Sequence, residues 1–177
     1  TEFAFSGLGL NQHYGTPPNP FDAERITGGS TSGGAASVAF GLAAATLGSD
    51  TGGSLRIPAA FCGLTGFKPS QESIPGEGAY PLAPSLDCVG PIAPSVDCCA
   101  RLWSILADRP MPALDATPRP LRLAIAEGGL LGELDDAVRD GLEAAVAALE
   151  AKGCHVERLP FAAVDGALAI NQQGGLV

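Results

Sequence analysis

Two segments with different patterns of apolar and polar residues follow one another in the first quarter of this chain. Residues 1–27 show no regular hydrophobic period, because glycine and proline interrupt every run, and they are expected to form loops. From Gly34 to Leu47 helix-forming residues are apolar on every side, which predicts a helix that is buried all round. The uninterrupted apolar part is shorter than the ~20 residues that a bilayer requires, so a membrane-spanning segment is not expected.

Shorter elements are predicted in the middle of the chain. The stretches Gly63–Phe67 and Leu86–Ala93 each fit a short strand. Ser95 is expected to cap a helix that continues to about Ala107, since apolar residues recur there at three- and four-residue steps. Residues 109–120 carry four prolines and are predicted to form a linker or a long surface loop.

The last third of the chain has the pattern of a strand, a helix and a second strand. Leu121–Ala126 is the first predicted strand, and acidic residues at 133–136 open a helix for which Gly153 is the natural C-cap. His155–Phe161 is the next strand, and a further helix is expected to start after it. Because a strand–helix–strand unit places its two strands in parallel, the pattern predicts an α/β fold.

Length, composition and charge narrow the classes of function. The 177 residues are 46% apolar and 16% charged, which is a globular composition, and the length fits one domain of ordinary size. The net charge of −9 would repel a phosphate backbone on average, so a nucleic-acid partner is not expected.

The chain contains five cysteines, which are Cys62, Cys88, Cys98, Cys99 and Cys154. Their number is odd, and the chain is too long to depend on disulfide bonds. The spacing fits no zinc ribbon, so they are interpreted as small buried hydrophobic residues and not as metal ligands. We therefore expect reduced thiols in a cytoplasmic protein, with no metal and no cofactor.

Two turns rich in glycine and serine lie at the ends of the uncharged segment. They read GGSTSGG from Gly28 and GSDTGGS from Gly48. A serine nucleophile needs a base and nearby donors for the carbonyl oxygen, and glycines allow backbone N–H groups to converge on one point. From the residues alone, helix caps and tight turns are the commoner explanation, and catalysis is the alternative.

The two turns and their surroundings resemble the signature of the amidase signature enzymes, which are serine hydrolases acting on amides. GGSTSGG and LGSDTGGSLRIPAAFCGLTGFKPS carry the resemblance over residues 28–70 almost without a gap, and the segments on both sides are similar too. The resemblance implies a mixed sheet covered by helices. Residues 1–177 would be a single partial domain, with a signature core at 1–108, the proline-rich loop at 109–120 and the strand–helix–strand unit at 121–177.

The resemblance also implies a catalytic triad of serine, cis-serine and lysine. Carried over by position, Ser54 is the nucleophile and Ser30 the cis-serine that relays protons. The oxyanion hole would consist of the N–H groups of Thr51, Gly52, Gly53 and Ser54.

The lysine of the triad is not found where the family has it. In the family it lies several tens of residues before the cis-serine, and none of the 29 residues before Ser30 is a lysine. Lys68 matches a structural position, and Lys152 lies on the late helix. We therefore expect these residues to be an internal section of a longer amidase that hydrolyses a small-molecule amide, and the chain alone to be inactive.

Other functions and other residues remain open. One alternative is a stand-alone scaffold that binds amides or partners without turnover. Another is a glutamine-hydrolysing subunit of a tRNA-dependent amidotransferase. Association into a homo-oligomer is left open.

Ser32 either lines the site or bonds within its turn. Asp50 and Arg56 are expected to brace the second turn, with contact between Arg56 and an anionic substrate group as the minority alternative. His13 and His155 are interpreted as structural.

Overall fold

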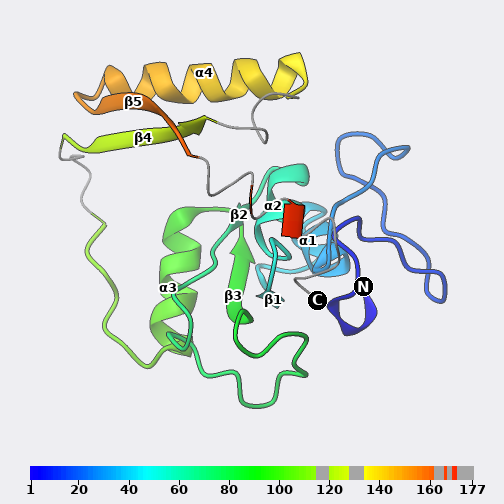
Figure 1. Ribbon diagram of the computed structural model, residues 1–177. Coiled ribbons are helices and arrows are strands. Elements are labelled where there is room, and N and C mark those ends of the chain that lie inside the picture. The colour runs from blue at the N-terminus through cyan, green and yellow to red at the C-terminus, as the bar shows by residue number, and fades with distance from the viewer. Residues whose placement is uncertain (115–119, 128–133, 162–165, 167–168, 171–177) are drawn as a thin grey trace. The chain divides into compact units, whose positions relative to one another are not determined.

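The computed structural model describes residues 1–114, 120–127, 134–161, 166 and 169–170. It divides into two compact units, Thr1–Leu114 and Asp115–Val177, which are described separately (Figure 1). Helices and strands occur in both units, so the α/β class predicted from the sequence is confirmed.

The first unit is built on a three-stranded antiparallel sheet. Its strands are β1 (Thr46–Asp50), β2 (Thr65–Gly66) and β3 (Cys88–Ala93), in the order β1-β3-β2. In the register of β1 and β3, Gly48 lies opposite Gly90 and Asp50 opposite Cys88. The central strand β3 is therefore the element on which the rest of the unit assembles.

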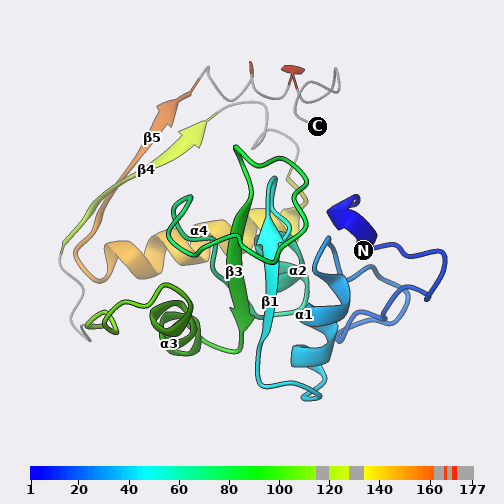
Figure 2. The ribbon, with the colours of Figure 1, turned by 90° about the horizontal axis from the view of Figure 1, so that it is seen from below.

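Three helices pack around this sheet. They are α1 (Ser32–Ala39), α2 (Arg56–Phe61) and α3 (Val96–Leu106). Helix α1 lies beside β1 and α3 beside β3 (Figure 2). The buried core joins α1, α2 and β3 through Ala35, Leu55, Ala59, Cys62 and Ile92.

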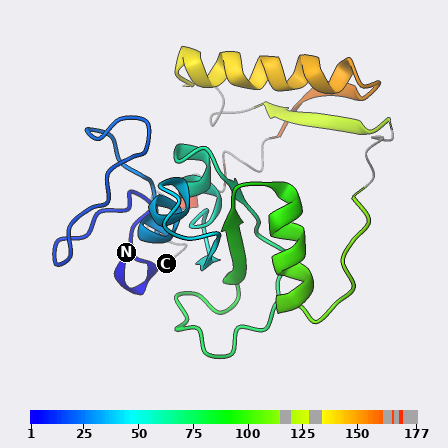
Figure 3. The ribbon, with the colours of Figure 1, turned by 180° about the vertical axis from the view of Figure 1, so that it is seen from behind.

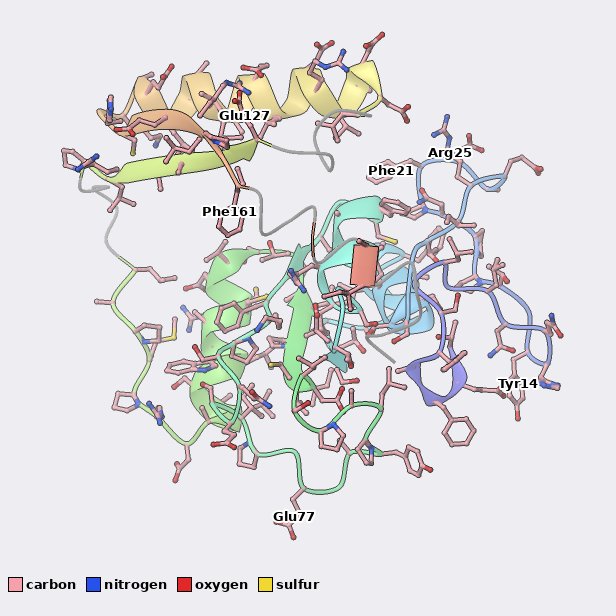
Figure 4. All side chains as sticks on the ribbon, viewed as in Figure 1. Tyr14, Phe21, Arg25, Glu77, Glu127 and Phe161 are labelled. Atoms are coloured by element: carbon pink, nitrogen blue, oxygen red, sulfur yellow. The ribbon has the colours of Figure 1, made fainter. Side chains whose placement is uncertain are left out.

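The N-terminal residues are mostly loop, as predicted. Apart from the 3₁₀ helix η1 (Glu2–Ala4), residues 1–27 form no helix or strand. Seen from behind, these loops and α3 lie at opposite sides of the sheet (Figure 3). Figure 4 shows Tyr14 and Phe21 projecting away from the loops, and both are largely exposed.

The predicted helix over Gly34–Leu47 is wrong in its second half. Helix α1 ends at Ala39, because Gly41 adopts the left-handed conformation with φ of +71°. Its N–H donates to Val38 O at 3.0 Å, and the N–H of Leu42 donates to Ser37 O at 2.8 Å, the pair of bonds that closes a helix at a left-handed glycine. Leu42 is 80% exposed in the structure, so this segment is not buried all round.

The strand β1 was missed by the sequence analysis, which placed a glycine-rich turn from Gly48 onward. Thr46–Asp50 instead pairs with β3 over five residues. Two glycines face each other in this pairing, and glycine weakens the local preference for a strand. Contact with β3 therefore decides the conformation of a segment whose own preference is a turn.

The other predicted elements of the first unit are confirmed. Strand β3 begins two residues later than expected, and β2 occupies two residues of the predicted strand. Helix α3 begins after Ser95, whose hydroxyl accepts a hydrogen bond from the N–H of Cys98 at 3.2 Å. The described residues of the proline-rich segment, 109–114 and 120, form no helix or strand.

The second unit is the predicted strand–helix–strand unit. Strands β4 (Arg122–Glu127) and β5 (His155–Pro160) are parallel, and α4 (Asp136–Glu150) connects them. The helix closes at Gly153 with φ of +83°, where the N–H of Cys154 donates to Leu149 O at 3.1 Å. Residue 133 and most of the helix expected after Phe161 lie outside the described residues.

No helix in the described ranges combines the length and the apolar character that crossing a membrane would need.

Candidate functional site

In the structure, Gly48 and Ser49 of the GSDTGGS segment belong to β1, and the turn itself connects the end of β1 to the start of α2. We call residues 50–56 the second serine turn. Asp50 is fully buried, and its carboxylate accepts hydrogen bonds from the N–H of Gly53 (2.7 Å) and the N–H of Leu55 (3.2 Å). Arg56 donates to the same carboxylate from Nε (3.0 Å), Nη2 (2.9 Å) and its backbone N–H (3.4 Å). These bonds hold the turn from inside, and they are the bracing contacts that the sequence predicts for Asp50 and Arg56.

The hydrogen bonds set the charge state of Asp50. Burial opposes ionisation of its carboxyl group, but the bonds from Arg56 and from the N–H groups of Leu55 and Gly53 outweigh burial, and the pKa of Asp50 lies below its ordinary value. The carboxylate correspondingly raises the pKa of Arg56. The turn therefore contains a permanently ionised pair at neutral pH.

Gly53 is required in this turn for two reasons. Its φ of +127° is a conformation that side chains disfavour. A Cβ atom at this position would also lie 2.7 Å from Cδ1 of Ile57, one turn further along the chain. The glycine directly before Ser54 thus has a steric cause in the fold.

The first serine turn, residues 28–32, precedes α1. The peptide bond between Gly29 and Ser30 is cis, the geometry that the resemblance implies for this position. The N–H of Gly29 donates to Gly7 O at 2.8 Å, which fastens the turn to the N-terminal loop. Ser30 and Ser32 are 7% and 3% exposed.

The fold brings the two serine turns together. The N–H of Thr31 donates to the carbonyl oxygen of Ser54 at 3.3 Å, so the residue that follows Ser30 is bonded to Ser54 directly. Close approach is allowed by Gly48, because a Cβ atom there would lie 2.4 Å from the hydroxyl oxygen of Thr31. The contact is made by backbone groups, and within the described residues no hydrogen bond joins the hydroxyls of Ser30 and Ser54.

The N–H groups of the second serine turn do not all have the same role. The N–H of Gly53 donates to Asp50 in the structure, so this one of the four donors expected for the oxyanion hole already has a partner. Among the residues that the structure describes, no protein group accepts a hydrogen bond from the N–H of Thr51, Gly52 or Ser54. These three N–H groups remain available to a ligand.

The lysines and histidines considered from the sequence lie in other surroundings. The ammonium group of Lys68 donates to Pro69 O at 2.8 Å and lies 3.6 Å from Sγ of Cys88. Lys152 belongs to the second unit. The side chain of His13 is 74% exposed and faces Glu2, and His155 lies 2.9 Å from Glu157 in the second unit.

The cysteines are free thiols in the structure, and four of the five are buried. Burial raises the pKa of the Cys62 thiol and, as the main cause, that of Cys99. In the described part of the chain, no group of three His, Cys, Asp or Glu side chains is arranged to hold a metal ion.

Two residues of this region were missed by sequence reasoning. Thr31 links the turns through its N–H, and Asp87 accepts a hydrogen bond from the hydroxyl of Thr51. Asp87 also lines, with Ser49 and Tyr80, a hollow of about 210 Å³. No local pattern marks Asp87, because its partner lies 36 residues away in the sequence.

The chain is similar to known proteins over most of its length. The family model described as Amidase matches residues 1–174. The chain is 38% identical to a glutamyl-tRNA(Gln) amidotransferase subunit of Symbiobacterium thermophilum over 95% of its length, and 37% identical to 2-amino-5-chloromuconic acid deaminase of Comamonas testosteroni over 99%. It covers 37% and 39% of these two proteins, so it spans less than two-fifths of their length.

Solved structures give the same result. A crystal structure of an amidase superposes with a TM-score of 0.82 at 38% sequence identity, over 90% of this chain and 36% of that one. Because the family match extends over residues 1–174, almost the whole chain, the chain belongs to the amidase family.

Proposed function

We propose that the protein to which this chain belongs hydrolyses the carbon–nitrogen bond of an amide through an acyl-enzyme on Ser54. One observation carries the proposal: Ser54 follows a turn in which the N–H groups of Thr51 and Gly52 have no acceptor among the described residues, and this turn is bonded to the turn of Ser30. Membership of the amidase family supports the same reaction.

In the proposed reaction, Ser30 relays protons between Ser54 and a neutral lysine. The lysine takes the proton of the Ser30 hydroxyl while Ser30 takes that of Ser54, and Oγ of Ser54 bonds to the carbonyl carbon. The N–H groups of Thr51, Gly52 and Ser54 stabilise the negative oxygen. The proton then passes to the amide nitrogen, the carbon–nitrogen bond breaks, and water hydrolyses the resulting ester to release the acid and restore Ser54.

The lysine in this proposal is neither Lys68 nor Lys152. Lys68 is engaged with Pro69 and Cys88, and both lysines follow Ser30 in the chain, whereas the resemblance places the lysine before the cis-serine. Since the chain spans less than two-fifths of its curated relatives, we place the base in a part of the protein outside this sequence. The proposal also includes a cytoplasmic location, which the free cysteines support. Both units belong to a single partial domain in this proposal. Ser32, the first residue of α1, is a supporting residue of the site.

Substitution of the serines in the full-length protein tests the proposal. Ser54→Ala should lower amide hydrolysis by about 10⁴-fold or more, as removal of a nucleophile does, and no acyl adduct should be detectable by mass spectrometry after rapid quenching. Ser30→Ala should lower kcat by roughly 10²- to 10⁴-fold, the usual contribution of proton transfer. His13→Ala is the control and should keep wild-type kinetics, because its side chain is exposed. An acyl adduct that persists in Ser54→Ala would overturn the proposal.

A second candidate is a glutamine-hydrolysing subunit of a tRNA-dependent amidotransferase. It is favoured by similarity to the glutamyl-tRNA(Gln) amidotransferase subunits, although the net charge of −9 counts mildly against a complex with tRNA. The two candidates differ in substrate: this one requires hydrolysis of glutamine to glutamate, whereas a general amidase would act on other small amides without partners. Assaying ammonia release from glutamine and from a panel of simple amides separates them.

A further inference from the structure

Asp87 is a carboxylate that the proposed reaction does not use. Its Oδ2 accepts hydrogen bonds from the N–H groups of Leu82 (2.9 Å) and Ala83 (3.0 Å), and its Oδ1 accepts one from the hydroxyl of Thr51. The N–H of Asp87 itself donates to Ala83 O at 2.9 Å. Asp87 is thus fixed within a tight loop and connects that loop to the second serine turn.

The pairing of β1 with β3 explains why these distant residues meet. Asp50 lies opposite Cys88 at the end of the antiparallel ladder. In such a ladder the next residue of one strand faces the preceding residue of the other, so Thr51 and Asp87 occupy the following pair of positions. The register of the sheet therefore places a carboxylate beside the start of the turn.

Gly52 has open space beside it in the second serine turn. Among the described residues, no atom lies within 4 Å of the place that a Cβ atom would occupy there. Its two neighbours are fixed by carboxylates: Thr51 through its hydroxyl by Asp87, and Gly53 through its N–H by Asp50. The turn is held at both ends while its middle remains open.

We propose that Asp87 is a positioning residue, which acts through the hydroxyl of Thr51 to aim the N–H groups of Thr51 and Gly52 at the carbonyl oxygen of the substrate. This inference rests on the proposed function, because it assigns a role in stabilising the oxyanion. Asp50 holds the end of the turn next to α2 through the N–H of Gly53, and Asp87 holds the end next to β3 through the hydroxyl of Thr51. Donors that are fixed before the reaction cost no reorganisation when negative charge develops.

The sharpest test removes the hydroxyl of Thr51 and keeps its shape. In the full-length protein, Thr51→Val should lower kcat by about 10- to 100-fold, part of the ~10²- to 10³-fold that loss of a whole donor costs, and should leave KM unchanged. Thr51→Ser retains the hydroxyl and should restore most of the activity. Thr46→Val makes the same exchange at the other end of β1 and should behave as wild type. A Thr51→Val enzyme with wild-type kcat, or a Thr51→Ser enzyme as slow as Thr51→Val, would overturn the inference.

A double-mutant cycle tests the link to Asp87 and does not depend on Thr51→Val alone. Asp87→Asn should also lower kcat, and adding it to Thr51→Val should produce little further loss, because both changes interrupt one contact. Additive losses would show that Asp87 acts in another way and would overturn the inference. If the wild-type protein hydrolyses no amide, the proposed function is overturned, and this inference with it. If the wild type is active and the Thr51→Val variant is equally active, only this inference is overturned.

Discussion

Replacing Asp50 by asparagine should release the second serine turn with little change of volume. Each oxygen of the carboxylate has donors of its own: Oδ1 accepts from Gly53 N–H and Arg56 Nη2, and Oδ2 accepts from Leu55 N–H and from Arg56 Nε and N–H. An asparagine presents one acceptor and one NH₂ group. In its better orientation it keeps the contacts of Oδ2 and places the NH₂ group against the donors at Oδ1.

The free-energy cost follows from the two bonds that are lost. The N–H of Gly53 is buried and would have no acceptor, which costs about 1–3 kcal/mol. The side chain of Arg56 is 55% exposed and can turn to water, so its loss adds little more than about 1 kcal/mol. We expect the turn to open more easily by about 3 kcal/mol, which corresponds to roughly a 100-fold increase in the open population.

Hydrogen exchange measures this opening directly. The N–H groups of Gly53, Leu55 and Arg56 donate to Asp50, so within a peptide covering residues 50–57 these three amides should exchange about 100-fold faster in Asp50→Asn. Asp22→Asn is the matched control. Asp22 also bonds a backbone N–H, that of Glu24, and an arginine, Arg25, but its side chain is 47% exposed, and its replacement should leave that peptide unchanged.

The effect of Asp50 should depend on pH in one direction. Because its pKa is lower in the folded protein, its ionised form stabilises the fold fully above the unfolded-state pKa of about 3.9, and this stabilisation is lost as the pH falls through the folded-state value. The difference in urea midpoint between wild type and Asp50→Asn should therefore be constant from pH 7 to pH 5 and should shrink below pH 4. Equal exchange rates in the two proteins, or a difference that grows on acidification, would refute the reasoning.

Three further substitutions test the packing of the first unit. Ser95→Ala should lower the free energy of unfolding by about 1 kcal/mol, because the N–H of Cys98 loses its cap, and urea unfolding with Ser95→Thr as the control measures the change. Gly90→Ala should destabilise by about 1–3 kcal/mol, because its Cβ atom would lie 2.2 Å from the carbonyl oxygen of Phe67. At Gly33 in α1, an added Cβ atom would meet no described atom within 4 Å, so Gly33→Ala should instead stabilise the protein by about 0.5–1 kcal/mol. A lower melting temperature for Gly33→Ala than for Gly90→Ala would contradict this interpretation of the packing.

Local signals predicted much of the fold. The cap at Ser95 and the left-handed Gly153 follow from residues within a few positions of each other, and the parallel pair of β4 and β5 follows from the order strand, helix, strand. The helix expected through Leu47 was wrong, although Gly41 carried a local signal for its end. An uninterrupted apolar run outweighed that single residue in the sequence, whereas in the fold its φ of +71° decides where the helix stops.

By itself the sequence determined which residues form the candidate site: the two turns, the glycines that shape them, and the serines they carry. Only the tertiary structure decided how these groups are used. The register of β1 and β3 brings Asp87 to Thr51, the bond from Thr31 joins the turns, and Asp50 accepts a hydrogen bond from the N–H of Gly53. Contacts between residues tens of positions apart depend on how strands pair and how closely backbones approach, and no local pattern of residue types encodes either of these.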